Sequence, residues 1–247
     1  MDERAYEFIR DNQFNHWWWH GKRRVIESTL HHFFHSKQQI EFLDIGSGYG
    51  ALIPTLRRWG EVDCIEPHTD AHEMLKDLGA RNIYTFTDFP LEYPDRKYDC
   101  VCLFDVLEHL PDDQHALSII KNHLLTHNGL LLITVPAYQW LWSTHDELHK
   151  HFRRYVKRTL TQMLKQSGFY IMYSSYFMTL LFPLALLNRL VQRITNPKSS
   201  ELSKPPRPVN HLFKAIFGLE SRFVPHISLP YGLSILIVAS ASQNKNG

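Results

Sequence analysis

The feature that most constrains this chain is a glycine cluster that directly follows a short apolar run. The segment reads Phe42-Leu43-Asp44-Ile45-Gly46-Ser47-Gly48-Tyr49-Gly50, which is typical of a buried strand followed by a tight turn. Gly46 and Gly48 let the backbone turn and approach a ligand closely because they carry no Cβ atom. A helix is predicted over about residues 50–59, so its first amides would point at that ligand.

Apolar runs that resemble strands alternate with helical segments over much of the chain. The predicted strands cover residues 40–45, 61–66, 82–87, 98–104, 130–135, 168–176 and 233–239, and further helices are predicted over residues 69–78, 112–124 and 157–167. This alternation predicts an α/β fold with a doubly wound, seven-stranded, mostly parallel, Rossmann-like sheet. Ligands bind such sheets at the carboxyl ends of the strands, so functional motifs should gather there.

Two segments fall outside this alternation. We expect residues 1–37 to form an N-terminal helical cap and residues 177–229 to form a helical insertion, leaving residues 38–176 and 230–247 as the core. The insertion contains an apolar piece over 177–194, a proline-rich piece over 196–209 and a second apolar helix over 210–223. Because so long a connection in a compact domain is usually functional or disordered, we expect two helices joined by a mobile linker.

Two acids near the glycine turn indicate the kind of ligand. Glu66 lies twenty residues after Gly46, where an acid can accept hydrogen bonds from both hydroxyls of a ribose. The spacing from Gly46 to Ala51 also permits a dinucleotide. However, Asp44 would repel a pyrophosphate and attract an ammonium group. S-adenosylmethionine (SAM) has an ammonium and a sulfonium and no phosphate, so it is the favoured cofactor. An NAD(P)-dependent oxidoreductase and a non-catalytic SAM-binding or membrane-docking protein remain alternatives.

With these motifs, residues 38–175 and the last strand resemble the small-molecule branch of the class I SAM-dependent methyltransferases. The resemblance implies that Asp88 and Phe89 face the adenine and that residues near 104–109 flank the methionine end of SAM. The implied cofactor-binding residues of the core are Asp44, Gly46, Ser47, Gly48, Gly50, Glu66, Pro67, Asp88, Phe89, Phe104, Leu107 and His109. Methyltransferases that modify the amino groups of nucleic acids typically carry an Asp/Asn-Pro-Pro-aromatic motif at this position. This chain has Phe104-Asp105-Val106-Leu107 instead, so no nucleic-acid partner is expected.

The segment after the fifth predicted strand resembles a bacterial subset of these enzymes with the pattern VPA…LWS…H.RRY. Members of that subset often serve polysaccharide or lipid-linked biosynthesis, which implies a small-molecule, saccharide or lipid-linked acceptor near this segment. The candidate acceptor residues are Tyr138, Trp142, Arg153, Arg154 and Tyr155. Arg153 and Arg154 could anchor an anionic acceptor by bidentate hydrogen bonds, or they could be solvated charges.

His149 and His151 are candidate general bases, because the pKa of histidine lies near the working pH. Together with His145 and Asp146 they could instead be scaffold residues or metal ligands. A metal site needs at least three converging ligands with a fixed outer shell, and we expect none here.

The N-terminal segment contains Trp17-Trp18-Trp19, followed at Lys22 by three basic residues. Three consecutive side chains cannot all face one side of a helix, so at least one should face the ligand while others dock on the core. In the resembling subset such a helix closes over the cofactor, which implies Trp18 and Arg24, or its neighbour Arg23, as cofactor contacts. A helix that is merely docked by its aromatic side chains is the alternative.

Charge and composition bear on partners and location. Lys and Arg total 27 against 25 acids, a net charge of +2, which does not favour nucleic acid. Residues 189–214 contain six basic residues and one acid. This positive charge beside apolar helices suits the surface of an anionic bilayer. A pocket lid and a homodimer interface are alternative roles. With three cysteines, no signal peptide and no long apolar run, we expect a cytoplasmic protein, with contact to the inner membrane face left open.

Overall fold

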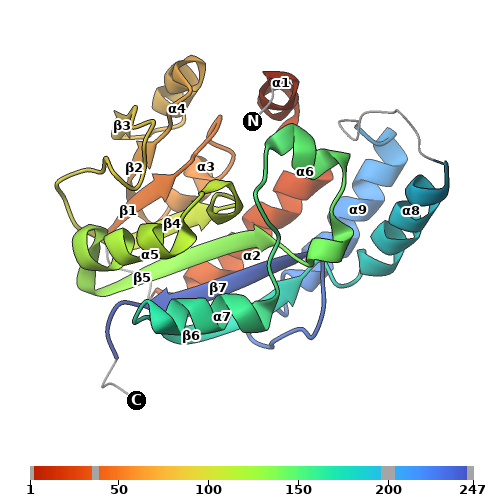
Figure 1. The fold of residues 1–247 in the computed structure, drawn as a ribbon. Helices are drawn as coiled ribbons and strands as arrows, with labels where there is room; N and C mark the ends of the chain where they lie inside the picture. Colours follow the sequence, from red (N-terminus) through yellow and green to blue (C-terminus); the bar gives the residue numbers. More distant parts are fainter. Residues whose placement is uncertain (1–2, 35–38, 196–203, 244–247) are drawn as a thin grey trace.

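The computed structural model describes residues 3–34, 39–195 and 204–243. Its centre is a seven-stranded sheet with the order β3-β2-β1-β4-β5-β7-β6, in which β7 alone runs in the opposite direction to the other strands (Figure 1). The strands are β1 (Ile40–Ile45), β2 (Gly60–Ile65), β3 (Asn82–Tyr84), β4 (Tyr98–Phe104), β5 (Leu125–Pro136), β6 (Tyr170–Phe177) and β7 (Ser234–Ser240). The predicted doubly wound α/β fold is confirmed.

Helices cover both faces of this sheet. They are α1 (Glu3–Asn12), α2 (Trp17–Phe33), α3 (Ile53–Leu56), α4 (His72–Asp77), α5 (Asp113–Ile119), α6 (Thr144–His149), α7 (Lys157–Gln166), α8 (Phe182–Thr195) and α9 (Arg207–Glu220). Short turns of other helix types are η1 (Thr69–Ala71), η2 (Leu107–His109), η3 (Ile120–Leu124) and η4 (Gln139–Leu141). In the view of Figure 1, α5 and α7 lie in front of the sheet and α2 lies behind it.

The alternation of side chains along each strand explains the two layers. Phe42 packs into one apolar cluster with side chains of α2, α3 and α9, whereas its neighbour Leu43 packs into the other with side chains of α5 and α7. Successive residues of a strand point to opposite faces, and helices on both faces require apolar side chains at nearly every position. The continuous apolar runs of the sequence therefore specify buried central strands.

Several element boundaries differ from the sequence predictions, and three of the differences lie in the core near the glycine turn, β3 and β5. The helix predicted over 50–59 is confined to α3, because Gly50 adopts a left-handed φ of +82° and Pro54 occupies the first turn. β3 ends at Tyr84 rather than at residue 87. β5 begins at Leu125, which pairs with Tyr98 before an irregularity in the ladder, rather than at residue 130.

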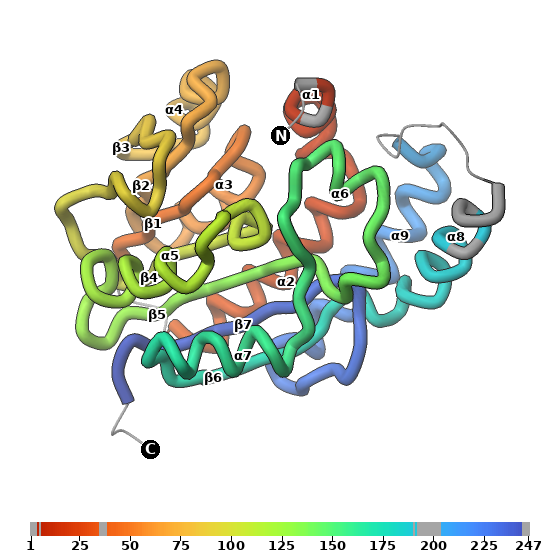
Figure 2. Tube along the Cα trace, in the orientation of Figure 1, coloured from red at the N-terminus to blue at the C-terminus, as the bar shows by residue number. Residues whose placement is uncertain are grey.

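The N-terminal helix α2 and the insertion helix α9 pack directly against each other. A Cβ atom at Gly21 would lie only 1.9 Å from the ring of Phe217, so the close approach of the two helices requires glycine there. The Trp17 amide donates a hydrogen bond to Asn210 Oδ1 at 2.9 Å. Both drawings show α8 beside α9 (Figure 2). The linker predicted to be mobile falls largely in 196–203, outside the described residues.

Candidate active site

A cavity of about 830 Å³ lies at the carboxyl ends of the parallel strands. Its walls come from α1, α2, the turn after β1, the end of β2, the segment after β4, α6 and α8. This is the edge of the sheet at which an α/β fold binds its ligands. The residues from the predicted sites that line it are Trp18, Asp44, Gly46, Ser47, Gly48, Glu66, Pro67, Phe104, His109, His149, His151 and Arg154.

The glycine turn forms one wall of the cavity. Gly46 has a φ of +70°, and a Cβ atom there would lie 2.6 Å from Val106 Cγ2, so glycine is required for the fold. Gly48 has a φ of +55°, but a Cβ atom there would have no described atom within 4 Å. The backbone at Gly48 thus faces open space in the cavity, which is room that a close-fitting ligand can use.

Two buried acids flank this turn. Glu66 accepts hydrogen bonds from the Gly48 amide at 2.6 Å and from the His68 amide at 2.9 Å. Burial raises the pKa of Glu66, against the lowering effect of those two backbone donors. Asp44 is 3% exposed, and burial raises its pKa to about 7. An ammonium group beside Asp44 and ribose hydroxyls at Glu66 would both offset this loss of solvent, so the residues present fit SAM.

An ion pair that sequence reasoning missed joins α2 to the end of β4. Lys22, only 4% exposed, places Nζ 2.7 Å from Asp105 Oδ2. Asp105 has a left-handed φ of +58°, and its other oxygen accepts a hydrogen bond from Thr134. No local pattern in the sequence indicates this pair, because it joins residues that are 83 positions apart.

Arg24, which the sequence predicts to contact the cofactor, lies away from the cavity. It lies against Gly218 and lines a separate hollow with Glu27 and Arg222. On a helix, residues two apart point about 200° from each other, so Lys22 and Arg24 cannot serve the same side. Lys22 is the basic residue of this run whose side chain reaches the cavity.

All three tryptophans of α2 contribute to the cavity wall. Trp17 packs edge-on against Phe213, and Trp18 stacks with Phe177 at a centroid distance of 6.5 Å. Trp19 lies edge-on to His16, whose ring caps α2 by accepting a hydrogen bond from the Trp18 amide. The tryptophans thus both dock the helix and line the cavity, which joins the two alternatives left open from the sequence.

The segment after β5 holds a carboxylate with several donors. Asp146 is fully buried, and Arg154 binds it in a bidentate manner, with Nε 2.7 Å from Oδ1 and Nη2 2.8 Å from Oδ2. His151 Nδ1 lies 2.8 Å from Asp146 Oδ1. Burial alone would raise the pKa of Asp146, but the hydrogen bonds from His151 and Arg154 outweigh it and hold that pKa well below its usual value.

Other histidines surround His151 in the cavity wall. The ring centroids of His109 and His149 lie 4.6 Å and 5.7 Å from that of His151. Burial, with the charges of neighbouring histidines, lowers the pKa of both His109 and His149 to about 3. Burial likewise lowers the pKa of His145 to about 4. These imidazoles are therefore neutral at pH 7.

Four of the predicted acceptor residues do not line the cavity. Arg153 pairs with Asp113 at 2.8 Å, and the Tyr155 hydroxyl donates to the same carboxylate at 2.9 Å. Tyr138 stacks on Tyr176. Trp142 is the fourth of these residues that do not line the cavity. Of the five, only Arg154 reaches the cavity, and its guanidinium is already engaged by Asp146.

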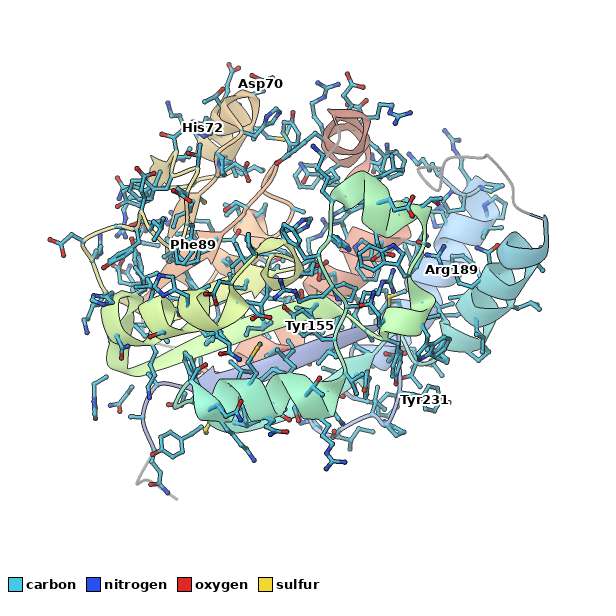
Figure 3. The ribbon with its side chains drawn as sticks, viewed as in Figure 1. Asp70, His72, Phe89, Tyr155, Arg189 and Tyr231 are labelled. Carbon is cyan, nitrogen blue, oxygen red and sulfur yellow. The ribbon has the colours of Figure 1, made fainter. Side chains whose placement is uncertain are left out.

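Besides Arg24, four predicted cofactor residues of the core lie outside the cavity wall. Gly50 supports the turn, since a Cβ atom there would lie 2.7 Å from Leu78, and Leu107 is fully buried in the core. Asp88 is exposed, and Phe89 packs partly buried at the β3 side of the sheet (Figure 3). Their assignment to the adenine remains a prediction.

A model of the methyltransferase domain matches residues 18–174, more than half of the chain. The chain belongs to this methyltransferase family. The match spans the glycine turn, the two buried acids and the histidine cluster, and it confirms the prediction of a methyltransferase enzyme. No curated protein matches the sequence significantly.

Solved structures with the same fold show low sequence identity. A SAM-dependent methyltransferase of Thermotoga maritima has a TM-score of 0.58 at 13% identity, covering 96% of this chain and 99% of that one. The [4+2]-cyclase SpnF has a TM-score of 0.56 at 16% identity, covering 88% and 80%. Phosphoethanolamine N-methyltransferase 2 of Haemonchus contortus, in complex with SAM, has a TM-score of 0.50 at 19% identity, covering 87% and 51%. Likeness at this identity shows the fold alone.

None of the helices within the described residues is long and apolar enough to cross a membrane.

Proposed function

We propose that this methyltransferase uses SAM to methylate a small-molecule, saccharide or lipid-linked acceptor. The observation that carries the proposal is the pair of buried acids, Asp44 and Glu66, on either side of the open space at Gly48. Membership of the methyltransferase family and the SAM bound by the phosphoethanolamine enzyme support the choice of cofactor.

Each part of the cavity has a role in holding SAM. Asp44 pairs with the ammonium group, because an ionised carboxylate in a low-dielectric site attracts a cation strongly. Glu66 keeps lone pairs for the ribose hydroxyls beyond those that accept from Gly48 and His68. The predicted contact of Asp88 and Phe89 with the adenine requires the loop after β3 to approach the cavity. When bound, SAM supplies a methyl group activated by its sulfonium.

His151 is the better of the two predicted bases. Its Nδ1 is fixed by Asp146, which leaves Nε2 as the ring atom that can take a proton from the acceptor. His149 also lines the cavity, but its lowered pKa makes it a poor proton acceptor. The neutral histidines and tryptophans of the wall exclude water and hold the acceptor close to the methyl group.

The side chains of helix α8 favour an amphipathic molecule as the acceptor. Ala185, Asn188 and Arg189 line the cavity from one side of the helix. Leu184 and Leu187 of the same helix are 50% and 58% exposed. Figure 3 shows Arg189 on α8, on the side of the molecule away from Phe89. A helix that offers leucines to the outside and polar groups to a cavity suits the surface of an anionic bilayer from which a lipid-linked acceptor is drawn.

The proposal is tested with methyl-labelled SAM and two fractions of a bacterial extract, one aqueous and one of extracted lipids. We expect label to appear in an acceptor of the lipid fraction, and Leu184→Glu to reduce binding to anionic vesicles without changing affinity for S-adenosylhomocysteine (SAH). Label only in the aqueous fraction would reject the lipid-linked acceptor. SAH binding without label in either fraction would favour a non-catalytic SAM-binding protein.

A further inference from the structure

Glu108 is a buried carboxyl group whose side-chain oxygens have no side-chain donor in the described structure. It is 0% exposed, and neither of its side-chain oxygens has a hydrogen-bond partner among the residues described. Glu108 is also one of the residues that line the cavity. Burying a carboxylate without a partner is costly, so such groups are usually paired with a cation or a donor. The roles proposed above for SAM and the acceptor do not use Glu108.

Two histidines supply further ligand atoms beside Glu108. One side-chain oxygen of Glu108 and one ring nitrogen each of His109 and His151 lie within 4.8 Å of one another. His109 follows Glu108 in η2, whereas His151 comes from the segment after α6. The Phe152 amide donates to the Glu108 carbonyl oxygen at 2.8 Å, so a backbone hydrogen bond holds the two segments together.

His151 is oriented as a metal-binding histidine would be. Its Nδ1 lies 2.8 Å from Asp146 Oδ1, and Arg154 holds that carboxylate in place. A carboxylate on one ring nitrogen fixes the tautomer and leaves the other nitrogen, Nε2, free to bind a cation. The His149 Nε2 atom, which is buried and without a partner in the described part of the chain, lies in the same wall as a further nitrogen donor.

We propose that Glu108, His109 and His151 form a binding site for a divalent first-row transition metal ion, with an open coordination position facing the cavity. Two histidines and one carboxylate, with a position left open, are a ligand set that zinc and similar ions take in catalytic sites. Ligand atoms at 2.0–2.2 Å from one such ion are about 3.4 Å apart, so the cluster would draw in by roughly 1 Å on binding. This proposal replaces the sequence-based expectation of no metal.

The consequence for catalysis rests on the proposed function. A metal held there would bind the oxygen of an acceptor hydroxyl at the open position and lower the pKa of that hydroxyl, whose proton would pass to solvent. The oxygen then forms its bond to the methyl carbon while the bond from that carbon to sulfur breaks, releasing SAH. His151 would then serve as a ligand rather than as the base, and oxygen would be the favoured methylated atom.

Metal binding is measured first, without SAM. The full chain is stripped with a chelator and titrated with Zn²⁺ by calorimetry and with Co²⁺ by visible absorption. We expect one ion per chain, and Glu108→Gln and His151→Asn to weaken binding at least about 100-fold. His127→Gln, which changes an exposed histidine outside the cavity, should leave the affinity unchanged. SAH titration of each variant shows whether the cofactor site is still folded.

The outcomes separate this proposal from the function on which its consequence rests. Absence of stoichiometric binding in the unmodified chain would overturn the metal site, as would unchanged binding in Glu108→Gln. The first result together with normal SAH binding would leave the methyltransferase proposal intact, and Glu108 would then be a neutral, protonated acid. Stoichiometric metal binding without SAH binding would support the metal site and reject the assignment of the cofactor.

Discussion

Lys22 and Asp105, 83 positions apart in the sequence, form an ion pair with Nζ 2.7 Å from Oδ2. The pair fastens the N-terminal helix α2 to the end of β4, at the cavity. The Lys22 side chain is nearly inaccessible, whereas that of Asp105 is 28% exposed. The contact therefore ties the helix that carries the three tryptophans to the strand end that precedes Glu108.

Lys22→Met should lower the free energy of unfolding by about 1–3 kcal/mol, because it leaves a partly buried carboxylate without its charged donor. Urea denaturation measures the loss. Arg58→Met is the matched control, since Arg58 pairs with Glu27 at an exposed site and such pairs contribute at most about 1 kcal/mol. Equal losses in the two variants would contradict a structural role for the Lys22 pair.

Gly48→Ala should weaken SAH binding at least about tenfold while costing only about 1–2 kcal/mol of stability, the cost of a left-handed φ for alanine. The added Cβ atom would project into open space in the cavity. Gly46→Ala, in contrast, should destabilise the chain more, because its Cβ atom would clash with Val106 at 2.6 Å. If Gly48→Ala bound SAH normally, the cofactor would not lie against this turn.

Glu66→Ala should raise the Kd for SAH about 10- to 100-fold. The variant removes the acceptor of the ribose hydroxyls and leaves the Gly48 and His68 amides without their acceptor. Glu73→Ala, an exposed acid on the neighbouring helix α4, is the control and should bind SAH as the unmodified chain does. An unchanged Kd in Glu66→Ala would show that the ribose lies elsewhere.

Asp44 predicts a pH dependence of both binding and stability. Its pKa of about 7 in the folded protein lies above the value of 3.8 for an unburied aspartate, because burial disfavours the charged form. Between these two pH values, Asp44 is protonated in the folded state without ligand and ionised in the unfolded state. Proton binding by folded Asp44 therefore stabilises the fold at low pH, and this stabilisation is lost as the pH rises from about 4 through 7. Ligand binding has the opposite sign, since only ionised Asp44 attracts an ammonium.

The Kd for SAH should accordingly fall as the pH rises from 6 to 8. Asp44→Asn should bind SAH more weakly and lose most of this dependence. Calorimetric titrations at four pH values across that range, with both proteins, measure the effect. The same slope in the two proteins would assign the titration to another group.

Asp146→Asn should lower the free energy of unfolding by about 3–5 kcal/mol. Arg154 would remain buried without its bidentate carboxylate, and breaking a buried pair by removing one partner is strongly destabilising. Asp112→Asn is a suitable control, because Asp112 is exposed and an asparagine there can still cap α5. Thermal unfolding of the two variants measures the difference. Equal melting temperatures would mean that Arg154 finds another acceptor.

Sequence reasoning identified the sheet because its signals are local. Runs such as Phe42–Ile45 and Leu130–Val135 are apolar except for one polar residue each, which is the pattern of strands covered on both faces. It also placed Asp44 and Glu66 at the cavity, since each ends or follows a parallel strand at the ligand-binding edge.

What the sequence could not supply was how segments distant along the chain meet. Nothing in the run from Lys22 to Arg24 indicates which basic side chain faces the cavity, because that depends on how α2 rotates as it packs on α9. Likewise, Glu108 and His151 are 43 positions apart, and their proximity depends on the hydrogen bond from Phe152 to Glu108. Arg153 and Tyr155 were predicted to contact an acceptor, but Asp113 engages both.

Calorimetric titration of the purified chain with SAH, with NADH as the comparison, tests the central claim most directly. The account predicts saturable binding of SAH at one site per chain and no binding of NADH. Binding of NADH, or of neither compound, would contradict the assignment of the cavity between Asp44 and Glu66 to SAM.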